Sequence, residues 1–284
     1  MPAETINLER CRERAPAAYE RLHKLIKHEN RIGVVFDGSC FTYKSSPTAK
    51  PLRLKGIHKK LARFWPYDEE GNIIPIREKD SSSSMEIGAR CQTQFATYLR
   101  TGAWPSEPYA AQALHAIERV AGLIVVAVEL AIADLGSWTG SAVDMLCVNP
   151  VDNGIGVIEY KTGMDHGDKE YGLLRNVPRE IAYSGFNKAC MQAAFYEDVI
   201  RTVYKFPVEY CFVVVSRTSK SSGKRETMGV FVPDHIRSLR VAHLLYGQVP
   251  DAPPPPPKKG KKRAPEEAEV GKGKRGKRTA TEDG

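Results

Sequence analysis

The sequence predicts an α/β protein whose middle part follows the order helix, three strands, helix, strand. Three apolar runs follow one another after residue 122, each carries one acidic residue, and Gly, Asn or Pro separates them. Runs of this length and β-rich composition indicate consecutive strands. Helical patterns flank them, and a fourth apolar run comes later. No stretch approaches the ~18 consecutive apolar residues of a membrane span.

The first helix of this order is expected over 109–122, with Gly122 near its C-terminal end. A second helix is predicted over 187–204 from the spacing of its apolar residues, with Pro207 behind it, and 208–216, VEYCFVVVS, reads as a buried strand. The three strands between the helices are expected over 123–132, over 139–148 and from Gly154 through Glu159-Tyr160-Lys161.

The triplet Glu159-Tyr160-Lys161 is the most informative feature. Side chains two positions apart on a strand point to the same side of a sheet. Burying both charges costs several kcal/mol each without compensation. The pair suits a site where the carboxylate holds a hard cation and the lysine approaches a water or an anionic oxygen. Asp144 supplies a second carboxylate if the two strands are neighbours; the alternative for the triplet is an exposed charged strand.

These motifs resemble the PD-(D/E)xK nucleases, in particular the RecB-like and lambda-exonuclease-like branch. Gly140 precedes Asp144, Thr162-Gly163 follows the acidic-x-Lys triplet, and Gln192 and Tyr196 form a QxxxY motif on the next helix. The resemblance covers roughly residues 85–216. It implies a restriction-endonuclease-like αβββαβ core with a mixed central sheet flanked by helices.

The resemblance also implies roles for single residues. Asp144, Glu159 and the backbone carbonyl of Tyr160 would bind one or two Mg²⁺ or Mn²⁺ ions. Lys161 would position or help deprotonate the attacking water and stabilise charge on the phosphate. Phosphodiester hydrolysis requires a nucleophile at neutral pH and neutralisation of charge on the phosphate oxygens. A bound metal ion and a lysine can together supply both.

Gln192 and Tyr196 share one helical face because they are spaced by four. The resemblance implies that they contact the DNA strand or orient the site. Without the upstream triplet, the same two residues are commonplace on an amphipathic helix.

A further acidic metal ligand is expected, and two residues compete for it. Glu129 lies on the strand before Asp144, whereas Glu86 opens a predicted helix capped by the run Ser81–Ser84. Related nucleases often carry GxxxH on this helix; here Gly88 is followed at that spacing by Gln92, a feeble metal ligand. We favour Glu129, for which the alternative is a solvent-facing strand residue.

The chain has 284 residues, of which 42% are hydrophobic. This length and composition predict one sizeable domain plus appendages. The N-terminus lacks the apolar core of a signal peptide. Six dispersed cysteines without a CxxC pair fit a reducing intracellular environment. An iron–sulfur cluster needs clustered cysteines, and none is expected.

Residues 1–84 are expected to form an N-terminal helical section. A helix is predicted over 8–28, in two pieces around Pro16, with a strand at RIGVVF behind it. The basic segment 50–63, with aromatic residues close behind, either grips DNA or forms a solvated helix packed on the nuclease core of 85–250.

The tail, 251–284, begins with a proline run and should be disordered. Residues 258–284 hold ten Lys or Arg and five Asp or Glu, so they carry +5 of the net charge of +8. KKGKKR and GKGKRGKR resemble nuclear-targeting signals, could tether the chain to DNA, or serve solubility alone. The basic tail therefore says little about a DNA groove in the folded body.

The expected function is hydrolysis of DNA phosphodiesters, first as an exonuclease acting at DNA ends in recombination, repair or viral DNA processing. The alternatives are a structure- or sequence-specific endonuclease and a noncatalytic DNA-binding scaffold. DNA is the expected partner, joined by a recombination or single-strand-annealing protein; a ring, as in lambda-type relatives, is one option for the oligomer. Nuclear location is an expectation from the tail, and no membrane partner is expected.

Overall fold

A mixed β-sheet runs through the part of the chain that the computed structural model describes, residues 4–37, 40–74, 81–163, 170–219 and 222–246. Nine strands lie in these residues, with the main order β2-β3-β4-β6-β7-β8-β9 and with β5 between β1 and β6. β4 runs parallel to β6, and β7 runs parallel to β8, whereas the other pairs are antiparallel. The strands are β1 Thr5–Ile6, β2 Val34–Phe36, β3 Phe41–Tyr43, β4 Leu52–Gly56, β5 Ile124–Asp134, β6 Thr139–Asn149, β7 Gly154–Thr162, β8 Tyr210–Thr218 and β9 Arg225–Phe231.

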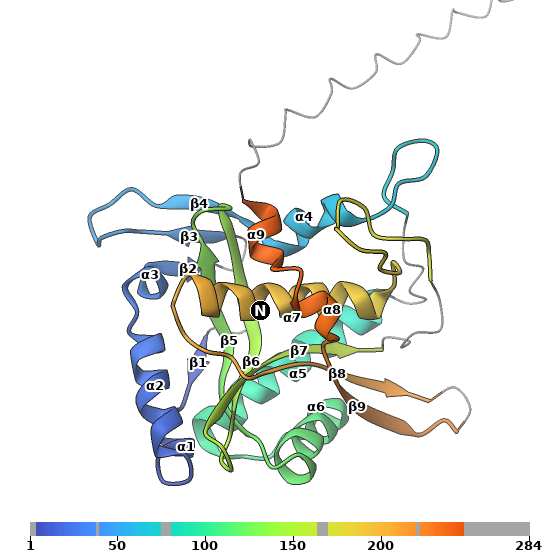
Figure 1. Cartoon of the computed structure of the whole chain (residues 1–284). Helices are drawn as coiled ribbons and strands as arrows, with labels where there is room; N and C mark the ends of the chain where they lie inside the picture. The colour runs from blue at the N-terminus through green and yellow to red at the C-terminus, as the bar shows by residue number, and fades with distance from the viewer. Residues whose placement is uncertain (1–3, 38–39, 75–80, 164–169, 220–221, 247–284) are drawn as a thin grey trace, which may run out of the picture. The chain divides into compact units, whose positions relative to one another are not determined.

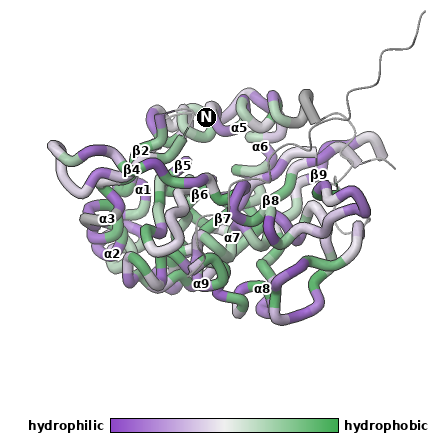
Figure 2. Tube along the Cα trace, turned by 90° about the horizontal axis from the view of Figure 1, so that it is seen from above, coloured by the Kyte–Doolittle hydropathy of each residue, from purple (hydrophilic) through white to green (hydrophobic). Residues whose placement is uncertain are grey.

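Helices cover both faces of this sheet (Figures 1 and 2). One layer contains α5 and α6, and the other contains α7 with α2, α8 and α9. The helices are α1 Glu9–Arg12, α2 Pro16–Ile26, α3 Glu29–Ile32, α4 Ile57–Leu61, α5 Ser81–Thr101, α6 Pro108–Leu114, α7 Gly185–Thr202, α8 Asp234–Arg237 and α9 Val241–Leu245. A 3₁₀ turn, Ala62–Phe64, follows α4, and a π-helical stretch, His115–Val120, follows α6.

The predicted order of helix, three strands, helix and strand is confirmed. The first helix is α6 with its π-helical extension, and Gly122 behind it has φ +70°. The three apolar runs are β5, β6 and β7, joined as an antiparallel meander. α7 begins after Ser184, whose hydroxyl accepts a hydrogen bond from the Asn187 amide, and β8 follows.

The expectation of a helical N-terminal section is wrong in part. The split at Pro16 is confirmed by α1 and α2, but the same section also contributes β1, β2, β3 and β4 to the sheet. These strands are two to five residues long, too short to show an apolar alternation in the sequence. α3 occupies the beginning of the predicted strand RIGVVF, so only its end is extended.

α5 begins at Ser81, so the serine run forms the first turn of the helix instead of a cap in front of it. Position 84, chosen from the sequence as the end of the N-terminal section, therefore lies inside α5. The strand β9 and the short helices α8 and α9 were not predicted. The basic tail that the sequence predicts to be disordered lies outside the described residues. In the described residues, no helix is long and apolar enough to cross a membrane.

One hydrophobic core joins the N-terminal section to the sheet and α7. Leu22 and Leu25 of α2 and Leu61 of α4 belong to the same buried cluster as Phe195 and Val199 of α7. Burial of each such side chain contributes roughly 1.5–3 kcal/mol. The N-terminal section is therefore part of the folded unit that holds β5 to β8.

Gly140 is required where β6 meets the N-terminal strands. A Cβ atom at this position would lie 2.4 Å from Phe41 Cβ, closer than side chains can pack, and in tight contact with Leu54 Cδ1 at 3.2 Å. The glycine that precedes Asp144 thus allows β3 and β4 to approach the strand that carries this carboxylate.

Candidate functional site

Three carboxylates lie at matching positions on three adjacent strands. The β5–β6 pairs on either side, Val128 with Met145 and Leu130 with Val143, place Glu129 of β5 across from Asp144 of β6. The β6–β7 register, continued by one residue beyond the pair Met145 and Ile158, places Asp144 opposite Glu159. Because opposite residues of neighbouring strands are close together, Glu129, Asp144 and Glu159 form a row across the sheet. We call this set the carboxylate row.

The carboxylate row is largely removed from water. Glu159 is fully buried, Glu129 is 5% exposed and Asp144 is half-buried. Burial, followed by the charge of Glu159, raises the pKa of Glu129 to about 7. The same two causes, in the same order, raise the pKa of Asp144 well above its usual range. Two carboxyls whose pKa is raised by burial and by the charge of Glu159 are arranged to gain from a bound cation.

Lys161 forms an ion pair with Glu159. Its Nζ contacts Glu159 Oε1, as expected for two side chains on the same side of β7. Neither carboxylate oxygen of Glu159 accepts a hydrogen bond of acceptable geometry from a described residue. Burying a carboxylate with so few hydrogen-bond donors destabilises the folded state unless another positively charged or hydrogen-bonding group binds it.

The backbone of β7 also contacts the carboxylate row. The Tyr160 amide donates a 2.8 Å hydrogen bond to Asp144 Oδ2, which fixes Asp144 against the strand that carries Glu159. The Tyr160 side chain belongs to the opposite layer, where its ring packs edge-on against Phe95 of α5. Only the backbone of Tyr160 is thus in position to take part in the site.

α7 closes the site with the predicted Gln192 and Tyr196. Both side chains are buried, and Gln192 Nε2 donates a 2.6 Å hydrogen bond to Tyr196 Oη. Burial and the charges of Glu159 and Asp144 raise the pKa of Tyr196 well above its usual range. The QxxxY pair and the carboxylate row therefore belong to one cluster, although they are far apart in the sequence.

Glu129 has an unusual backbone conformation. Its φ is +55°, in the left-handed region that favours glycine, although it lies in the middle of β5. A non-glycine residue held in this region costs about 1–3 kcal/mol, and such residues cluster at functional sites. The sequence carries no signal for this conformation.

α5 places its candidate residues differently. Glu86 is exposed and makes no hydrogen bond or ion pair to the carboxylate row within the described residues. A Cβ at Gly88 would lie 3.6 Å from Thr162 Oγ1, so this helix passes the end of β7. Gln92 Oε1 is buried without a hydrogen-bond partner among the described residues. Arg90 forms an exposed ion pair with Glu107, at 3.2 Å.

Two basic residues near the site were not singled out from the sequence. His58 of α4 interacts electrostatically with Lys161, Glu159 and Lys188, and its pKa is lowered by burial first and by the two lysines in addition. Lys188 lies on α7, four residues before Gln192, so Lys188, Gln192 and Tyr196 repeat with the spacing of one helical face. Extending the QxxxY pattern by one turn would have found Lys188.

The side chains fit a hard divalent cation in part. Glu159 has two buried oxygens, of which Oε1 is ion-paired with Lys161, and Asp144 and then Glu129 follow it along the row. Mg²⁺ is usually bound through one or two carboxylates and keeps several waters, so this donor set suffices. Within the described ranges, no three His, Cys, Asp or Glu side chains are already arranged around a common metal position. Binding would therefore require these side chains to turn toward the ion.

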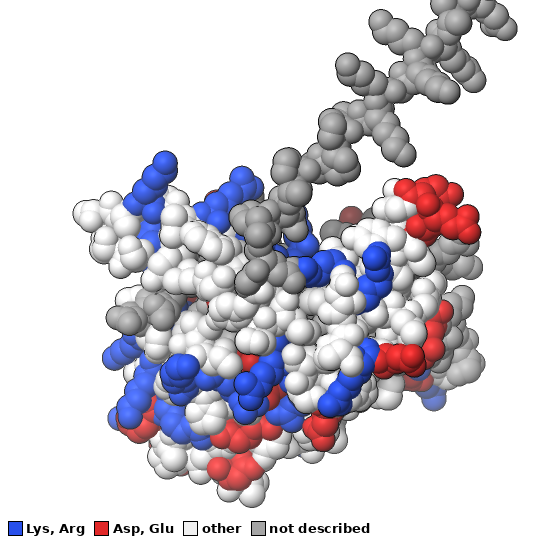
Figure 3. All heavy atoms as spheres, turned by 45° about the horizontal axis from the view of Figure 1, so that its top comes forward, with Lys and Arg blue, Asp and Glu red and all other residues white. Residues whose placement is uncertain are grey.

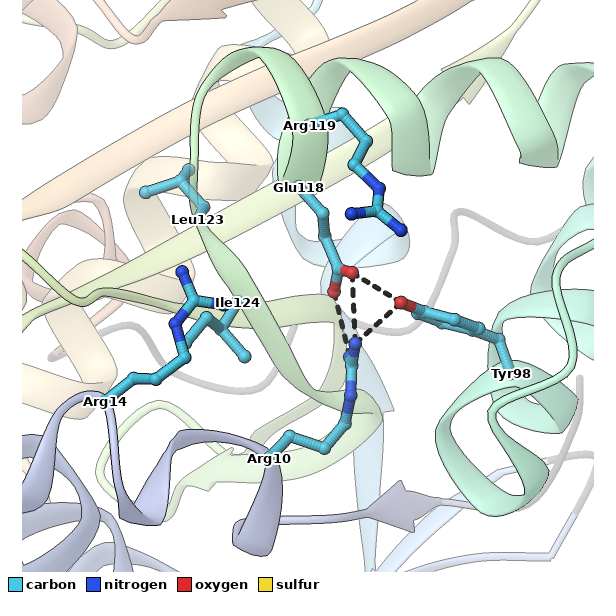
Figure 4. A pocket seen from close by; sticks show the side chains of 7 residues that line it. All are labelled: Arg10, Arg14, Tyr98, Glu118, Arg119, Leu123 and Ile124. Atoms are coloured by element: carbon cyan, nitrogen blue, oxygen red, sulfur yellow. Dashed lines mark hydrogen bonds and ion pairs between the residues drawn. The ribbon is translucent and has the colours of Figure 1, made fainter.

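A second polar cluster lies at the start of β5 (Figure 4). Arg10 contacts both oxygens of Glu118, at 2.8 and 3.0 Å, and donates to Tyr98 Oη at 2.7 Å and to the Val125 carbonyl. These groups line a pocket of about 200 Å³ with the exposed Arg14 and Arg119. The charges of Arg10 and Glu118 are paired with each other. We therefore assign this cluster a structural role, in which it links α1, α5 and β5.

Comparison with models of known protein families gives no match, and comparison with curated proteins gives no similar sequence. The functional assignment therefore depends on the fold and on the side chains of the site.

Proposed function

We propose that this protein is a metal-dependent DNA nuclease of the PD-(D/E)xK type. The observation that carries the proposal is the carboxylate row, Glu129, Asp144 and Glu159, with Lys161 paired to its most buried member. A phosphodiester hydrolase needs carboxylates for a hard cation and a positive group beside the reacting phosphate.

The topology supports the same proposal. Helices α5 and α6 precede the antiparallel meander β5-β6-β7, α7 follows, and β8 pairs in parallel with β7. This is the αβββαβ arrangement expected of a restriction-endonuclease-like core. The three acidic residues occupy the three strands of the meander, and the QxxxY pair occupies the helix that follows them.

Each residue has a distinct role in the proposed reaction. Asp144, Glu159 and Glu129 would hold Mg²⁺ or Mn²⁺, with the Tyr160 carbonyl as a further oxygen ligand. The bound ion would supply positive charge that polarises the phosphate and promotes hydrolysis. Lys161 would orient the attacking water and neutralise charge on the phosphate oxygens.

Gln192 and Tyr196 would shape the inner wall of the site. Their mutual hydrogen bond fixes both side chains, and Tyr196 lies where the charges of Asp144 and Glu159 act on it. In this proposal the pair holds the carboxylates in place and limits the access of bulk water.

The test is a cleavage assay with end-labelled linear DNA and closed circular DNA, in Mg²⁺, Mn²⁺ or EDTA. Wild type is compared with Glu159→Gln and Lys161→Ala, and Glu209→Gln serves as a control in an exposed ion pair with Arg21. Metal-dependent cleavage that is lost in both site variants and retained in Glu209→Gln is the expected result.

The form of the substrate distinguishes the two enzymatic readings. Degradation of linear DNA alone indicates an exonuclease acting at ends, which the resemblance favours. Cleavage of circles indicates an endonuclease. DNA binding without cleavage under any metal would contradict the enzymatic proposal and leave a DNA-binding scaffold.

A further inference from the structure

We propose that Tyr67 and Arg175 form a stacking platform for an unpaired base of single-stranded DNA next to the proposed active site. The inference concerns two residues outside the nuclease motifs. It rests on the proposed function for the identity of its ligand, a DNA strand.

Two loops carry the platform, and both lie on the side of the sheet where β7 ends and α7 begins (Figure 1). The 65–74 loop follows α4 and its 3₁₀ turn, and the 170–183 loop leads into α7. Lys188, the fourth residue of α7, places its Nζ 5.5 Å from the ring centroid of Trp65. Gln192 of the proposed site lies one turn further along the same helical face. Trp65 and Lys188 therefore connect the 65–74 loop to the helix that closes the site.

The two loops are held against each other. The Arg175 amide donates a 2.7 Å hydrogen bond to the Phe64 carbonyl, directly before the 65–74 loop. Tyr183 Oη donates a 3.0 Å hydrogen bond to the Ile74 carbonyl at the other end of that loop. The rings of Trp65 and Tyr183 pack together with their centroids 5.5 Å apart. These contacts fix both loops before any ligand binds, which lowers the entropy cost of binding.

Tyr67 and Arg175 meet on the surface of the two loops. The guanidinium carbon of Arg175, an exposed residue, lies 4.8 Å from the centroid of the Tyr67 ring, and Tyr67 is 40% exposed. Two further apolar side chains of these loops are exposed, Ile73, which forms a β-bridge with Tyr67, and Leu173. A cation stacked on an exposed ring, with apolar side chains on the same fixed loops, indicates a binding surface.

The chemistry of this surface suits the face of a nucleobase. Bases stack on aromatic rings and on guanidinium planes, and they do so with little dependence on sequence because every base has a π face. In a duplex these faces are covered by the neighbouring bases of the stack. The platform therefore selects an unpaired base, which makes single-stranded DNA its ligand.

The charges around the platform indicate where the phosphates of this strand lie. Glu69 and Glu70 are exposed in the 65–74 loop and repel phosphates. Positive charge lies at the start of α7, where Lys188 contacts Trp65, and over β3, β4 and α4, where Lys and Arg side chains gather on the face seen in Figure 3. We therefore expect the backbone of the strand to follow α4 and α7, with a base turned toward Tyr67.

The experiment measures DNA binding by fluorescence anisotropy in EDTA, where metal-dependent cleavage is absent. Three fluorescein-labelled probes of equal length are compared: single-stranded oligothymidylate, a strand with the same backbone made of abasic sites, and a blunt duplex. The proteins are wild type, Tyr67→Ala, Tyr67→Phe and Arg175→Ala. Thermal melting of every variant checks that it is folded. Arg175→Ala, a change at an exposed side chain, keeps the test decisive if Tyr67→Ala does not fold.

Trp104→Ala is the matched control. Trp104 is 42% exposed and also has an arginine over its ring, with the guanidinium carbon of Arg119 at 5.8 Å from the centroid. It lies in the connection between α5 and α6, in the layer opposite α7. The control thus removes a comparable ring from a place outside the proposed platform.

Tyr67→Ala should weaken binding to oligothymidylate about tenfold, because it removes the ring on which a base stacks. Its binding to the abasic strand and to the duplex should be unchanged, since neither offers an unpaired base. Arg175→Ala should weaken binding to oligothymidylate about threefold. Tyr67→Phe, which keeps the ring, and Trp104→Ala should bind all three probes like wild type.

The inference is overturned if the folded Tyr67→Ala and Arg175→Ala variants bind oligothymidylate as tightly as wild type, or if Tyr67→Ala loses as much affinity for the abasic strand. An equal loss in Trp104→Ala, or a wild type that does not bind single strands, overturns it too. Its failure is separable from failure of the nuclease proposal. Loss of binding in Tyr67→Ala without any cleavage by wild type would retain the platform and reject the nuclease. Cleavage by wild type with unchanged binding in the variants would retain the nuclease and reject the platform.

Discussion

The backbone amide of Tyr160 donates a 2.8 Å hydrogen bond to Asp144 Oδ2, so one acidic residue of the site is fixed by the strand that carries another. Asp144 and Glu159 consequently move together when β6 and β7 move. The spacing between the two carboxylates is set by strand pairing, which is more rigid than a loop would be.

Loss of Glu159 should remove the stabilisation that Mg²⁺ gives. A ligand that binds only the folded state stabilises it by about 2.7 kcal/mol at roughly a hundred times its Kd. We expect Mg²⁺ to raise the melting temperature of wild type and to have little effect on Glu159→Gln or Asp144→Asn. Differential scanning fluorimetry with and without Mg²⁺ measures this, and an equal shift in wild type and variants would contradict the assigned ligands.

Replacing Lys161 by Met should destabilise the protein in EDTA. The change leaves the fully buried Glu159 without its ion-pair partner, at a cost of about 2 kcal/mol, less than for a fully buried pair because Lys161 is partly exposed. Adding Glu159→Gln to Lys161→Met should recover much of this loss. Urea denaturation of the two single variants and the double variant completes the cycle; additive effects would show that the two side chains do not interact.

Glu129 should make the metal-free protein less stable as the pH rises. Its folded-state pKa of about 7 is above the usual value of 4.5, so the folded state retains a proton that the unfolded state has lost. The free energy of unfolding therefore decreases as the pH rises from 4.5 to about 7, by an amount on the order of 2 kcal/mol. The Glu129→Gln variant should not show this decrease. Denaturation in EDTA at about pH 5 and about pH 8 checks it; a wild type and variant with parallel pH profiles would rule it out.

Glycine at position 129 should be more stable than alanine there. In the interior of a strand, glycine is ordinarily worse than alanine by roughly 0.5–1 kcal/mol. The φ of +55° at Glu129 reverses this order, because alanine would keep the strain that glycine avoids. Both substitutions remove the carboxylate, so the comparison of Glu129→Gly with Glu129→Ala isolates the backbone. Lower stability of the glycine variant would mean that this residue is not held in the left-handed region.

Glu118→Ala should lower the free energy of unfolding by about 3 kcal/mol. It removes the carboxylate that pairs with Arg10, a side chain that is only 21% exposed, and leaves Tyr98 without its carboxylate partner. Glu9→Ala is the matched control, because its pair with Arg12 is exposed on both sides and should contribute little to stability. Similar losses in the two variants, measured by chemical denaturation, would count against a structural role for Glu118.

The sequence predicted the central meander and α7 because these elements are long and strongly patterned. β5, β6 and β7 are nine to eleven residues long and largely apolar, and each has an acidic residue within its apolar run, which made both the strands and these carboxylates recognisable in the sequence. Asp144 and Glu159 lie on neighbouring antiparallel strands. The loop that joins these strands sets their register, and the register determines which residues lie opposite each other.

Other features depend on contacts that no local pattern reveals. β2, β3 and β4 are short, and their place in the sheet follows from the approach of Phe41 to Gly140. α4 lies beside β6 and α7 because β4 pairs with β6. The left-handed conformation of Glu129 is imposed by the surrounding strands, and glutamate has no preference for it.

The shared core of α2, α4 and α7 has a consequence for how this protein can change over evolutionary time. Leu22, Leu61 and Phe195 belong to one buried cluster, so a cut in the gene at the codon for residue 84 would expose apolar surface on both fragments. Domain shuffling succeeds where few contacts cross the boundary, and this boundary is crossed by a hydrophobic core. A gene segment that encodes the carboxylate row alone would therefore not encode a stable domain. A recombination event that transfers this row must transfer the first 84 residues as well.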